Sequence, residues 1–344
     1  MGLVRETRAV THTVVEFDEL MGEQGAAAMV DLCERFGRYG MYSQEHVDSD
    51  IGRGLSQRHD AASNFVKTGG RFGRNEPLQV LAARTNYFRE TYAYGHEERV
   101  EGIGPFLHHE GFIAAARQLF GRPIIEPAIV YANLLVPGQE LAVHTDVPEF
   151  RGVNRKKHPQ WLIVAMHHSG LFDEWRMPIA TGVSWFHDCA GGEFAFYPEG
   201  ATAKPVAHPV RYNTALLMDT DSVFHGVDRV AETAAPVDKL RPGMRLRYAG
   251  DGRWVMADGD EVVAEYRWNE LRYSVSWKAY CFADEAEQRA WQQSSDDLSV
   301  TKVVDRLVDD LREKGVITGE RPSDTVLVDV LIDSYIHYPA PAGS

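Results

Sequence analysis

His144 and Asp146 are separated by one residue at the end of the segment YANLLVPGQELAVHTD, residues 131–146. Residues two apart in a β-strand point to the same face, so both side chains can reach one metal ion. His225, in the later segment NTALLMDTDSVFHGVDRV, is the candidate third ligand. Two histidines and one carboxylate on one side of a metal leave other coordination positions open, as in non-haem Fe(II) sites. The three residues therefore predict a metal site that can carry out chemistry.

Histidine and aspartate residues can also have purely structural roles. A His-x-Asp pair also arises by chance or as a hydrogen-bonded surface pair. His167 and His168 are adjacent, as are His187 and Asp188. Adjacent side chains on a strand point to opposite faces and do not chelate one ion easily, so we expect structural roles for these pairs.

A late segment, ELRYSVSWKAYCF at residues 270–282, could supply a cavity wall. Its alternation places five side chains on one polar face, namely Arg272, Ser274, Ser276, Lys278 and Tyr280. An outward polar face would make this an ordinary half-buried strand. If the face points toward the metal pair, a guanidinium and a hydroxyl two residues later can bind a carboxylate.

Short strands separated by turns must position these residues, and such a pattern suggests a closed or sandwiched β unit. We expect strands at residues 7–16, 128–135, 140–146, 161–167, 179–187, 193–198, 213–219 and 223–228. Two Asp-Gly turns divide residues 245–268 into a three-stranded meander, which we expect to be inserted into the core.

Helical spacing flanks the β region on both sides. We expect helices at residues 17–36, 76–94, 105–120, 284–293, 300–314 and 324–336. Residues 39–75 show no sustained period, and a run of that length is either a functional lid or a disordered loop.

Composition limits the function classes. The chain has 344 residues, a formal net charge of -14 and a pI near 5.5, which argues against a nucleic-acid surface. The three cysteines are far apart and suggest neither disulfides nor a zinc site. No signal segment or apolar run of membrane-spanning length appears, so we expect a soluble cytoplasmic protein without a membrane partner. The sequence does not specify the oligomeric state.

The order His144-x-Asp146, His225, Arg272-x-Ser274 resembles the Fe(II)/2-oxoglutarate-dependent oxygenase superfamily. Further matching contexts are Asn133-x-x-x-Pro-Gly before the first histidine, Gly-Gly-Glu at 191–193 and Phe-His-Gly-Val at 224–227. The resemblance covers about residues 110–282.

This resemblance implies a fold, cofactors and site residues. The fold would be α+β, with a cupin-like, jelly-roll, double-stranded β-helix core flanked by N- and C-terminal helices. His144, Asp146 and His225 would bind Fe(II), and Arg272, Ser274, Asn133 and Tyr131 would bind 2-oxoglutarate. The 47-residue separation of His225 from Arg272 is longer than the family usually shows, which leaves Lys278 as the competing cation.

We expect an oxygenase domain at residues 1–282, with an N-terminal helical part to about 123. The β core would span 124–282 with the meander at 243–268, and a C-terminal helical extension, 283–344, would pack on it.

The activity implied by the resemblance is a 2-oxoglutarate-dependent dioxygenase that uses dioxygen. Its carboxylate ligand favours hydroxylation of a C–H bond in a small polar or anionic metabolite, such as an amino acid or natural-product intermediate. Desaturation or ring formation, and a non-catalytic cupin-like binding protein, remain alternatives. For the substrate, Arg84, Tyr92 and Arg151 are candidate contacts, with solvated-loop or packing roles as the other readings.

Overall fold

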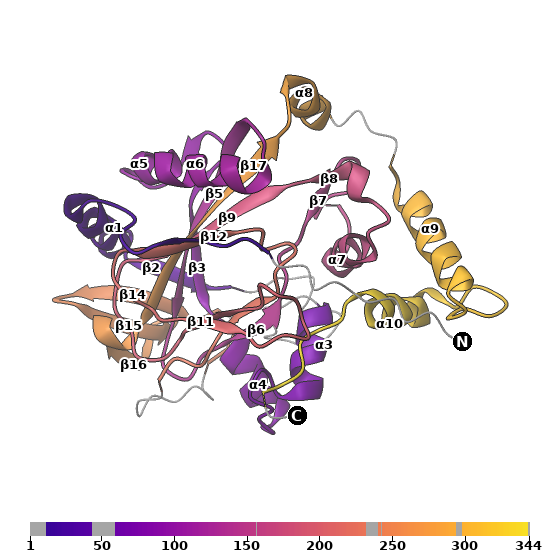
Figure 1. Ribbon diagram of the computed structural model, residues 1–344. Helices are drawn as coiled ribbons and strands as arrows, with labels where there is room; N and C mark the ends of the chain where they lie inside the picture. The colour runs from indigo at the N-terminus through magenta and orange to yellow at the C-terminus, as the bar shows by residue number, and fades with distance from the viewer. Residues whose placement is uncertain are drawn as a thin grey trace.

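The computed structural model describes residues 12–42, 59–155, 157–231, 240–241, 243–293 and 298–342. Strands in this part of the chain form a large antiparallel sheet, a four-stranded sheet and a two-stranded ribbon. Figure 1 shows the strands crossing the middle of the molecule, with helices above and to the sides.

Eight strands form the β core. In the large sheet the order is β12 (Thr214–Met218), β9 (Ile179–Trp185), β17 (Arg272–Phe282) and β5 (Ile124–Leu135). In the smaller sheet it is β11 (Val206–His208), β10 (Phe194–Phe196), β13 (His225–Val227) and β6 (Leu141–His144).

Along the chain these strands pass back and forth between the two sheets, which makes the core a jelly roll, or double-stranded β-helix. Apolar side chains from both sheets meet between them, for example Trp185 and Leu216 with Phe194 and Val227. The fold is therefore α+β with the expected jelly-roll core.

The large sheet continues beyond the jelly roll on both sides. Strand β1 (Val15–Phe17) pairs with β12, and β3 (Phe88–Tyr94) pairs with β5. Strand β2 (Arg38–Met41) joins β3 to the meander, and the short β4 (Glu97–Glu98) pairs with β3. The meander itself comprises β14 (Arg245–Gly250), β15 (Arg253–Asp258) and β16 (Glu261–Arg267), as expected from its Asp-Gly turns.

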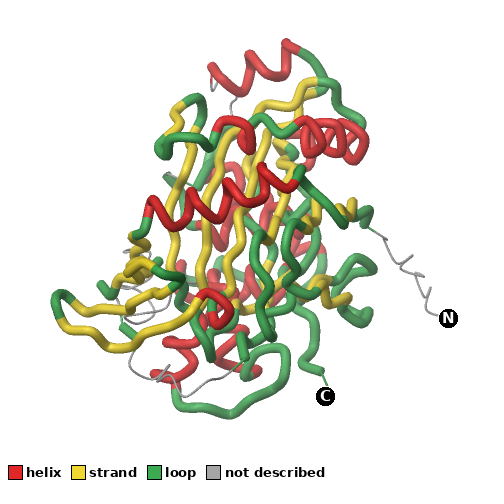
Figure 2. The backbone as a smooth tube through the Cα atoms, turned by 90° about the vertical axis from the view of Figure 1, so that its left-hand side faces the viewer, coloured by secondary structure: helices red, strands yellow, loops and turns green. Residues whose placement is uncertain are grey.

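Helices cover the outer face of the large sheet. Helix α1 (Glu23–Phe36), α5 (Gly104–Leu107) and α6 (Glu110–Phe120) bury apolar residues there, among them Met29, Phe106 and Phe112. Figure 2 shows a helix that lies across the long strands. This packing leaves the opposite face of the sheet for the interior of the jelly roll.

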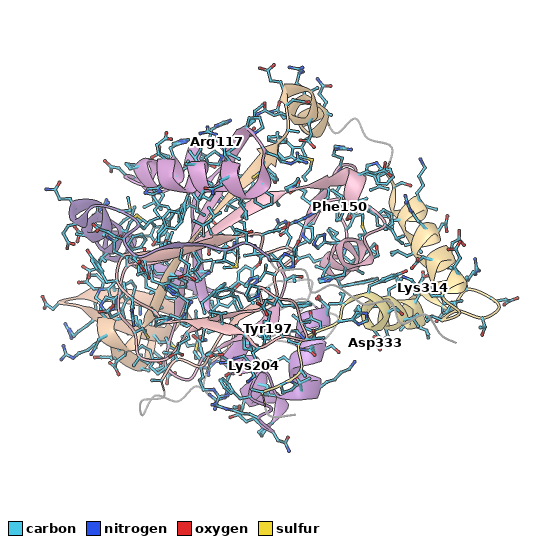
Figure 3. All side chains as sticks on the ribbon, in the orientation of Figure 1. Arg117, Phe150, Tyr197, Lys204, Lys314 and Asp333 are labelled. Atoms are coloured by element: carbon cyan, nitrogen blue, oxygen red, sulfur yellow. The ribbon has the colours of Figure 1, made fainter. Side chains whose placement is uncertain are left out.

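A second apolar cluster lies around α7 (Gln160–Ser169). It includes helices α9 (Val300–Glu313) and α10 (Asp324–Tyr335), through Leu307 and Leu331. Figure 3 labels Lys314 and Asp333 in this region, at the right of the view. Helix α8 (Glu285–Gln293) instead follows β17 at the top of Figure 1. These bounds confirm the three helices expected after residue 283.

Two secondary-structure expectations assign the wrong type of element. Residues 161–167 form α7 rather than a strand, because a short apolar run fits a buried helix as well as a buried strand. Residues 76–94 form α4 (Leu78–Thr85) followed by β3, so a helix covers only the first part.

The N-terminal part is not purely helical, because β1, β2 and β3 all belong to the large sheet. In the stretch 39–75, β2 and α3 (His59–Thr68) are ordered elements, whereas residues 43–58 lie outside the described residues. Helix α3 packs on β6 through Phe65 and Ala142. No described helix is long and apolar enough to cross a membrane.

Candidate metal centre

The structure brings His144, Asp146 and His225 together. One ligand atom from each residue lies within 4.8 Å of the others, and the two imidazole centroids are 4.5 Å apart. The reason is strand register, since β6 and β13 pair antiparallel with His225 directly opposite His144. Asp146 follows β6, and its backbone N–H donates to Thr220 O at 2.8 Å.

Backbone carbonyls orient both histidines. His144 Nδ1 lies 2.7 Å from Ala142 O, and His225 Nδ1 lies 2.9 Å from Val223 O. A carbonyl oxygen only accepts, so each Nδ1 carries the proton and each Nε2 has a lone pair for a metal. Each histidine bonds the residue two positions before it, an arrangement that sequence reasoning did not foresee.

Lys278 holds the carboxylate ligand from the opposite sheet. Its Nζ donates to Asp146 Oδ2 at 2.7 Å and to Thr181 Oγ1 at 3.0 Å. Burial alone would raise the pKa of Asp146, but Lys278, His225 and His144 outweigh it and hold that pKa well below its usual range. Asp146 is therefore ionised, as a metal ligand must be.

The metal group borders a chamber of about 90 Å³ between the two sheets. Arg272, Ser274, Asn133 and Tyr131 all line it, together with Arg89 on β3. The polar alternation of β17 thus points into the chamber rather than toward solvent. Of the competing cations, Arg272 lies in this lining, whereas Lys278 is bound to Asp146.

Arg272 is an incompletely satisfied cation in this chamber. It is 2% exposed; its Nε donates to Gly192 O at 2.7 Å and its Nη1 to Ser274 Oγ at 2.9 Å. Its Nη2 has no hydrogen-bond partner, and no described carboxylate forms an ion pair with it. Burial lowers the pKa of Arg272 to about 10. Asn133 Oδ1 is a second buried atom without a partner. Both atoms fit a chamber built for a polar ligand that carries a carboxylate.

Arg89 was not singled out in the sequence. Its guanidinium stacks over the ring of Tyr131 at 3.6 Å and over Tyr42 at 4.9 Å. It lies directly opposite Asn133 in the β3–β5 register. Reading residues 88–94 as a strand would have placed Arg89 on the inward face.

The three candidate substrate residues lie away from the chamber lining. Arg84 forms an ion pair with Glu76 at 2.6 Å and donates to Gly138 O at 2.8 Å. Tyr92 is fully buried in the outer core, beside the hydroxyl of Tyr39. Arg151 donates to Glu174 O at 2.7 Å. Each side chain has a structural role at its own place in the fold.

Comparisons with known proteins give structural matches only. No family model and no curated protein matches this sequence. A prolyl-4-hydroxylase from Pseudomonas putida is 11% identical, with 80% of this chain and 97% of that chain covered and a TM-score of 0.38.

A Trichoplax adhaerens prolyl hydroxylase, solved with a hypoxia inducible factor peptide, is 12% identical over 81% of this chain and 87% of that one, with a TM-score of 0.42. HygX from Streptomyces hygroscopicus, solved with nickel and 2-oxoglutarate, is 10% identical. The match covers 79% of this chain and 83% of that chain, with a TM-score of 0.36. Strand order defines the fold, and side-chain geometry defines the site.

Proposed function

We propose that this protein is an Fe(II)- and 2-oxoglutarate-dependent dioxygenase that hydroxylates a C–H bond of a small polar metabolite. The observation that carries the proposal is that a His-Asp-His group and a buried Arg272, which pairs with no described carboxylate, line one chamber. A metal site alone would not require that arginine. A carboxylate-binding cation beside open metal positions suits a chelating 2-oxo acid.

His144, Asp146 and His225 would hold Fe(II) through two imidazole nitrogens and one carboxylate oxygen. Arg272 and Ser274 would bind the distal carboxylate of 2-oxoglutarate, supported by Asn133 and Tyr131. When bound, the iron and the 2-oxo acid supply oxidative decarboxylation coupled to C–H oxidation.

The chain's own residues orient the ligands and exclude water. Lys278 binds Asp146 Oδ2, and Asp146 Oδ1 lies 3.8 Å from His144 Nε2. Asp146 would therefore hold the iron through Oδ1. The apolar layer around Trp185, Phe194 and Leu216 separates the arginine end of the chamber from solvent.

The test uses anaerobic protein with Fe(II) and 2-oxoglutarate. We expect a visible metal-to-ligand charge-transfer band, and release of succinate when air is admitted. His225→Ala should lose the band, whereas Lys204→Ala, an exposed lysine labelled in Figure 3, should keep it. Absence of the band in the unmodified protein, or its survival in His225→Ala, would favour a non-catalytic cupin-like binding protein.

A further inference from the structure

A second, larger cavity of about 370 Å³ lies beyond the metal chamber. We call it the outer cavity. It is formed by the ends of β3, β5 and β17, by β7 (Glu149–Phe150) with the residues after it, and by α8. Its volume is within the range of small-molecule sites. The lining residues used below are Tyr94, Glu126, Glu149, Arg155, Tyr280 and Trp291.

The outer cavity lies farther along the same strands as the metal chamber. On β17, Ser276 lines the chamber, Lys278 contacts Asp146, and Tyr280 lines the outer cavity. On β5, Tyr131 lines the chamber and Ile129 the outer cavity. Side chains two apart on one face are separated by roughly 7 Å. A molecule beside Tyr280 therefore lies about one such separation from Lys278, whose Nζ contacts Asp146.

Aromatic rings form part of the cavity wall. The rings of Tyr280 and Trp291 have centroids 4.3 Å apart, and Tyr94 is 40% exposed. An aromatic face carries partial negative charge and attracts an organic cation placed over it.

Two carboxylates in the cavity lining also favour a cationic ligand. Glu149 Oε2 accepts from Tyr280 Oη at 2.7 Å, and Glu126 Oε2 accepts from Gln288 Nε2 at 2.6 Å. Glu126 also lies directly opposite Tyr280 in the β5–β17 register. Neither glutamate forms an ion pair with a described residue. Both are anchored through one oxygen by neutral donors, so their negative charges are held but not neutralised.

The single cation in the described lining is Arg155, whose Nη2 donates to Val147 O at 3.3 Å. Two carboxylates against one guanidinium leave the cavity with an excess of negative charge. A neutral ligand would leave that excess uncompensated, and an anionic ligand would add to it.

We propose that the outer cavity binds a substrate that carries an organic ammonium group, held by Glu126 and Glu149 between the aromatic rings. This inference rests on the proposed function and names its substrate class. The ammonium end would stay in the outer cavity, while the carbon to be oxidised reaches past Lys278 toward the metal.

The experiment measures binding to the metal-free protein by saturation-transfer NMR. The probes are n-butylammonium, the neutral butan-1-ol and the anionic butyrate, which share one carbon chain. We expect n-butylammonium to bind about ten-fold more tightly than the alcohol, and butyrate to bind most weakly. Equal affinities, or a preference for the alcohol or for butyrate, would overturn the proposal.

Variants locate the site. Glu126→Gln with Glu149→Gln should remove the preference for n-butylammonium, because both amides still bond Gln288 and Tyr280 without charge. Glu265→Gln, on the exposed β16, is the matched control and should retain it. If the double variant is less folded by circular dichroism, Glu126→Gln alone should reduce the preference. An unchanged preference in a folded variant contradicts the assignment.

Because these measurements use neither iron nor 2-oxoglutarate, they are independent of the charge-transfer test. A charge-transfer band without selectivity for the ammonium probe would retain the proposed function and reject the substrate class. Selectivity for the ammonium probe without a charge-transfer band would retain the ammonium-binding site and reject the proposed function.

Discussion

Lys278 lies in the interior of the β core, where an unpaired ammonium group would be costly. Burial lowers its pKa, but the attraction of Asp146 more than compensates and raises it. The lysine and the carboxylate therefore keep each other charged. Since Thr181 accepts a second bond from Nζ, the ammonium group has a fixed position from which to hold Asp146.

Replacing Lys278 should weaken the metal site without removing a ligand. For Lys278→Met we expect a loss of about ten- to a hundred-fold in Co(II) or Mn(II) affinity, as for other residues that orient a metal ligand. Isothermal titration of the metal-free protein measures it. Lys278→Arg should recover part of the affinity, and Lys204→Met should change nothing. An unaltered affinity in Lys278→Met would mean that Asp146 does not need this contact.

Arg272 should determine which 2-oxo acid binds. Arg272→Ala removes charge-assisted bonds worth about 2–3 kcal/mol, which is roughly a hundred-fold in 2-oxoglutarate affinity. The charge-transfer band, titrated with 2-oxoglutarate, reports the loss. Binding of 2-oxobutanoate, which lacks the distal carboxylate, should be little affected. If both acids weaken equally, Arg272 acts on the metal site in general.

Asp221 offers a stability test with a defined pH dependence. It is fully buried, its carboxylate oxygens accept no hydrogen bond from the described residues, and its Oδ2 lies 3.6 Å from Arg176 Nη2. Burial raises its pKa to about 7, above the unfolded value near 3.8. The folded state thus prefers the protonated acid, and this contribution to stability falls as pH rises from about 4 to 7.

Asp221→Asn should therefore stabilise the protein more at pH 8 than at pH 5. The additional gain is about 1–3 kcal/mol, since each pKa unit corresponds to about 1.4 kcal/mol. Urea unfolding at the two pH values measures it. A gain that is the same at both pH values would show that Asp221 is ionised throughout this range.

At the scale of elements, the close approach of β13 to β6 places the two histidines opposite each other. Gly226 permits it, because a Cβ there would lie 2.8 Å from Leu141 O and 3.2 Å from Val143 Cα. Both are backbone atoms that cannot rotate away. The requirement for glycine is therefore steric and follows from strand pairing.

Gly226→Ala should separate the strands and reduce both stability and metal affinity. Overpacking of this kind costs about 1–3 kcal/mol, and the displaced His225 should weaken Co(II) binding. Thermal unfolding and metal titration check the two effects. Gly22→Ala is the control, because nothing lies within 4 Å of the Cβ position at Gly22. Loss of stability with unchanged metal binding would show that His225 adjusts.

At the scale of the whole molecule, apolar residues form one cluster on the large sheet and another around α7, α9 and α10. The domain division proposed from the sequence, with an extension at residues 283–344, follows the second cluster only in part. Helix α8 lies on β17, and α7 comes from within the β region. The C-terminal helices α9 and α10 therefore pack on α7, a helix that lies within the β region of the chain.

The variant Leu307→Ala tests whether the cluster around α7, α9 and α10 unfolds together with the β core. Leu307 is fully buried, and its truncation should cost about 2–5 kcal/mol. If the molecule is cooperative, tryptophan fluorescence and circular dichroism should report one shifted unfolding transition. Two separate transitions would identify the C-terminal helices as an independent unit. Val326→Ala, at an exposed valine of α10, is the control.

Much of this arrangement could be predicted from local patterns. The inward face of β17 followed from its alternation, and the meander from its two Asp-Gly turns. The apolar run Leu162–Met166 was misassigned, because every residue in it is buried and the run lacks a period that separates helix from strand. Arg89 was missed for the related reason that β3 was read as a continuation of α4.

The contacts between sheets could not be predicted. Lys278 and Asp146 are 132 residues apart, and their bond depends on how far the two sheets are separated and offset. The bonds from His144 and His225 to carbonyls two residues earlier depend on side-chain rotation. The face to which a side chain points can be predicted from the alternation of its own strand. The residue that it contacts depends on how the two sheets pack.

The meander also gives the large sheet an edge at β16, with which no strand of the described residues pairs except β15. Such an edge exposes backbone N–H and C=O groups on which another chain could add a strand. Strand β16 carries exposed Glu261, Glu265 and Arg267 along its short length. Charged side chains at an edge oppose strand pairing with a second copy of the protein, because pairing would bury these charges or bring them close to like charges. The insertion thus extends the sheet and ends it in a strand whose exposed charges disfavour pairing with a second copy.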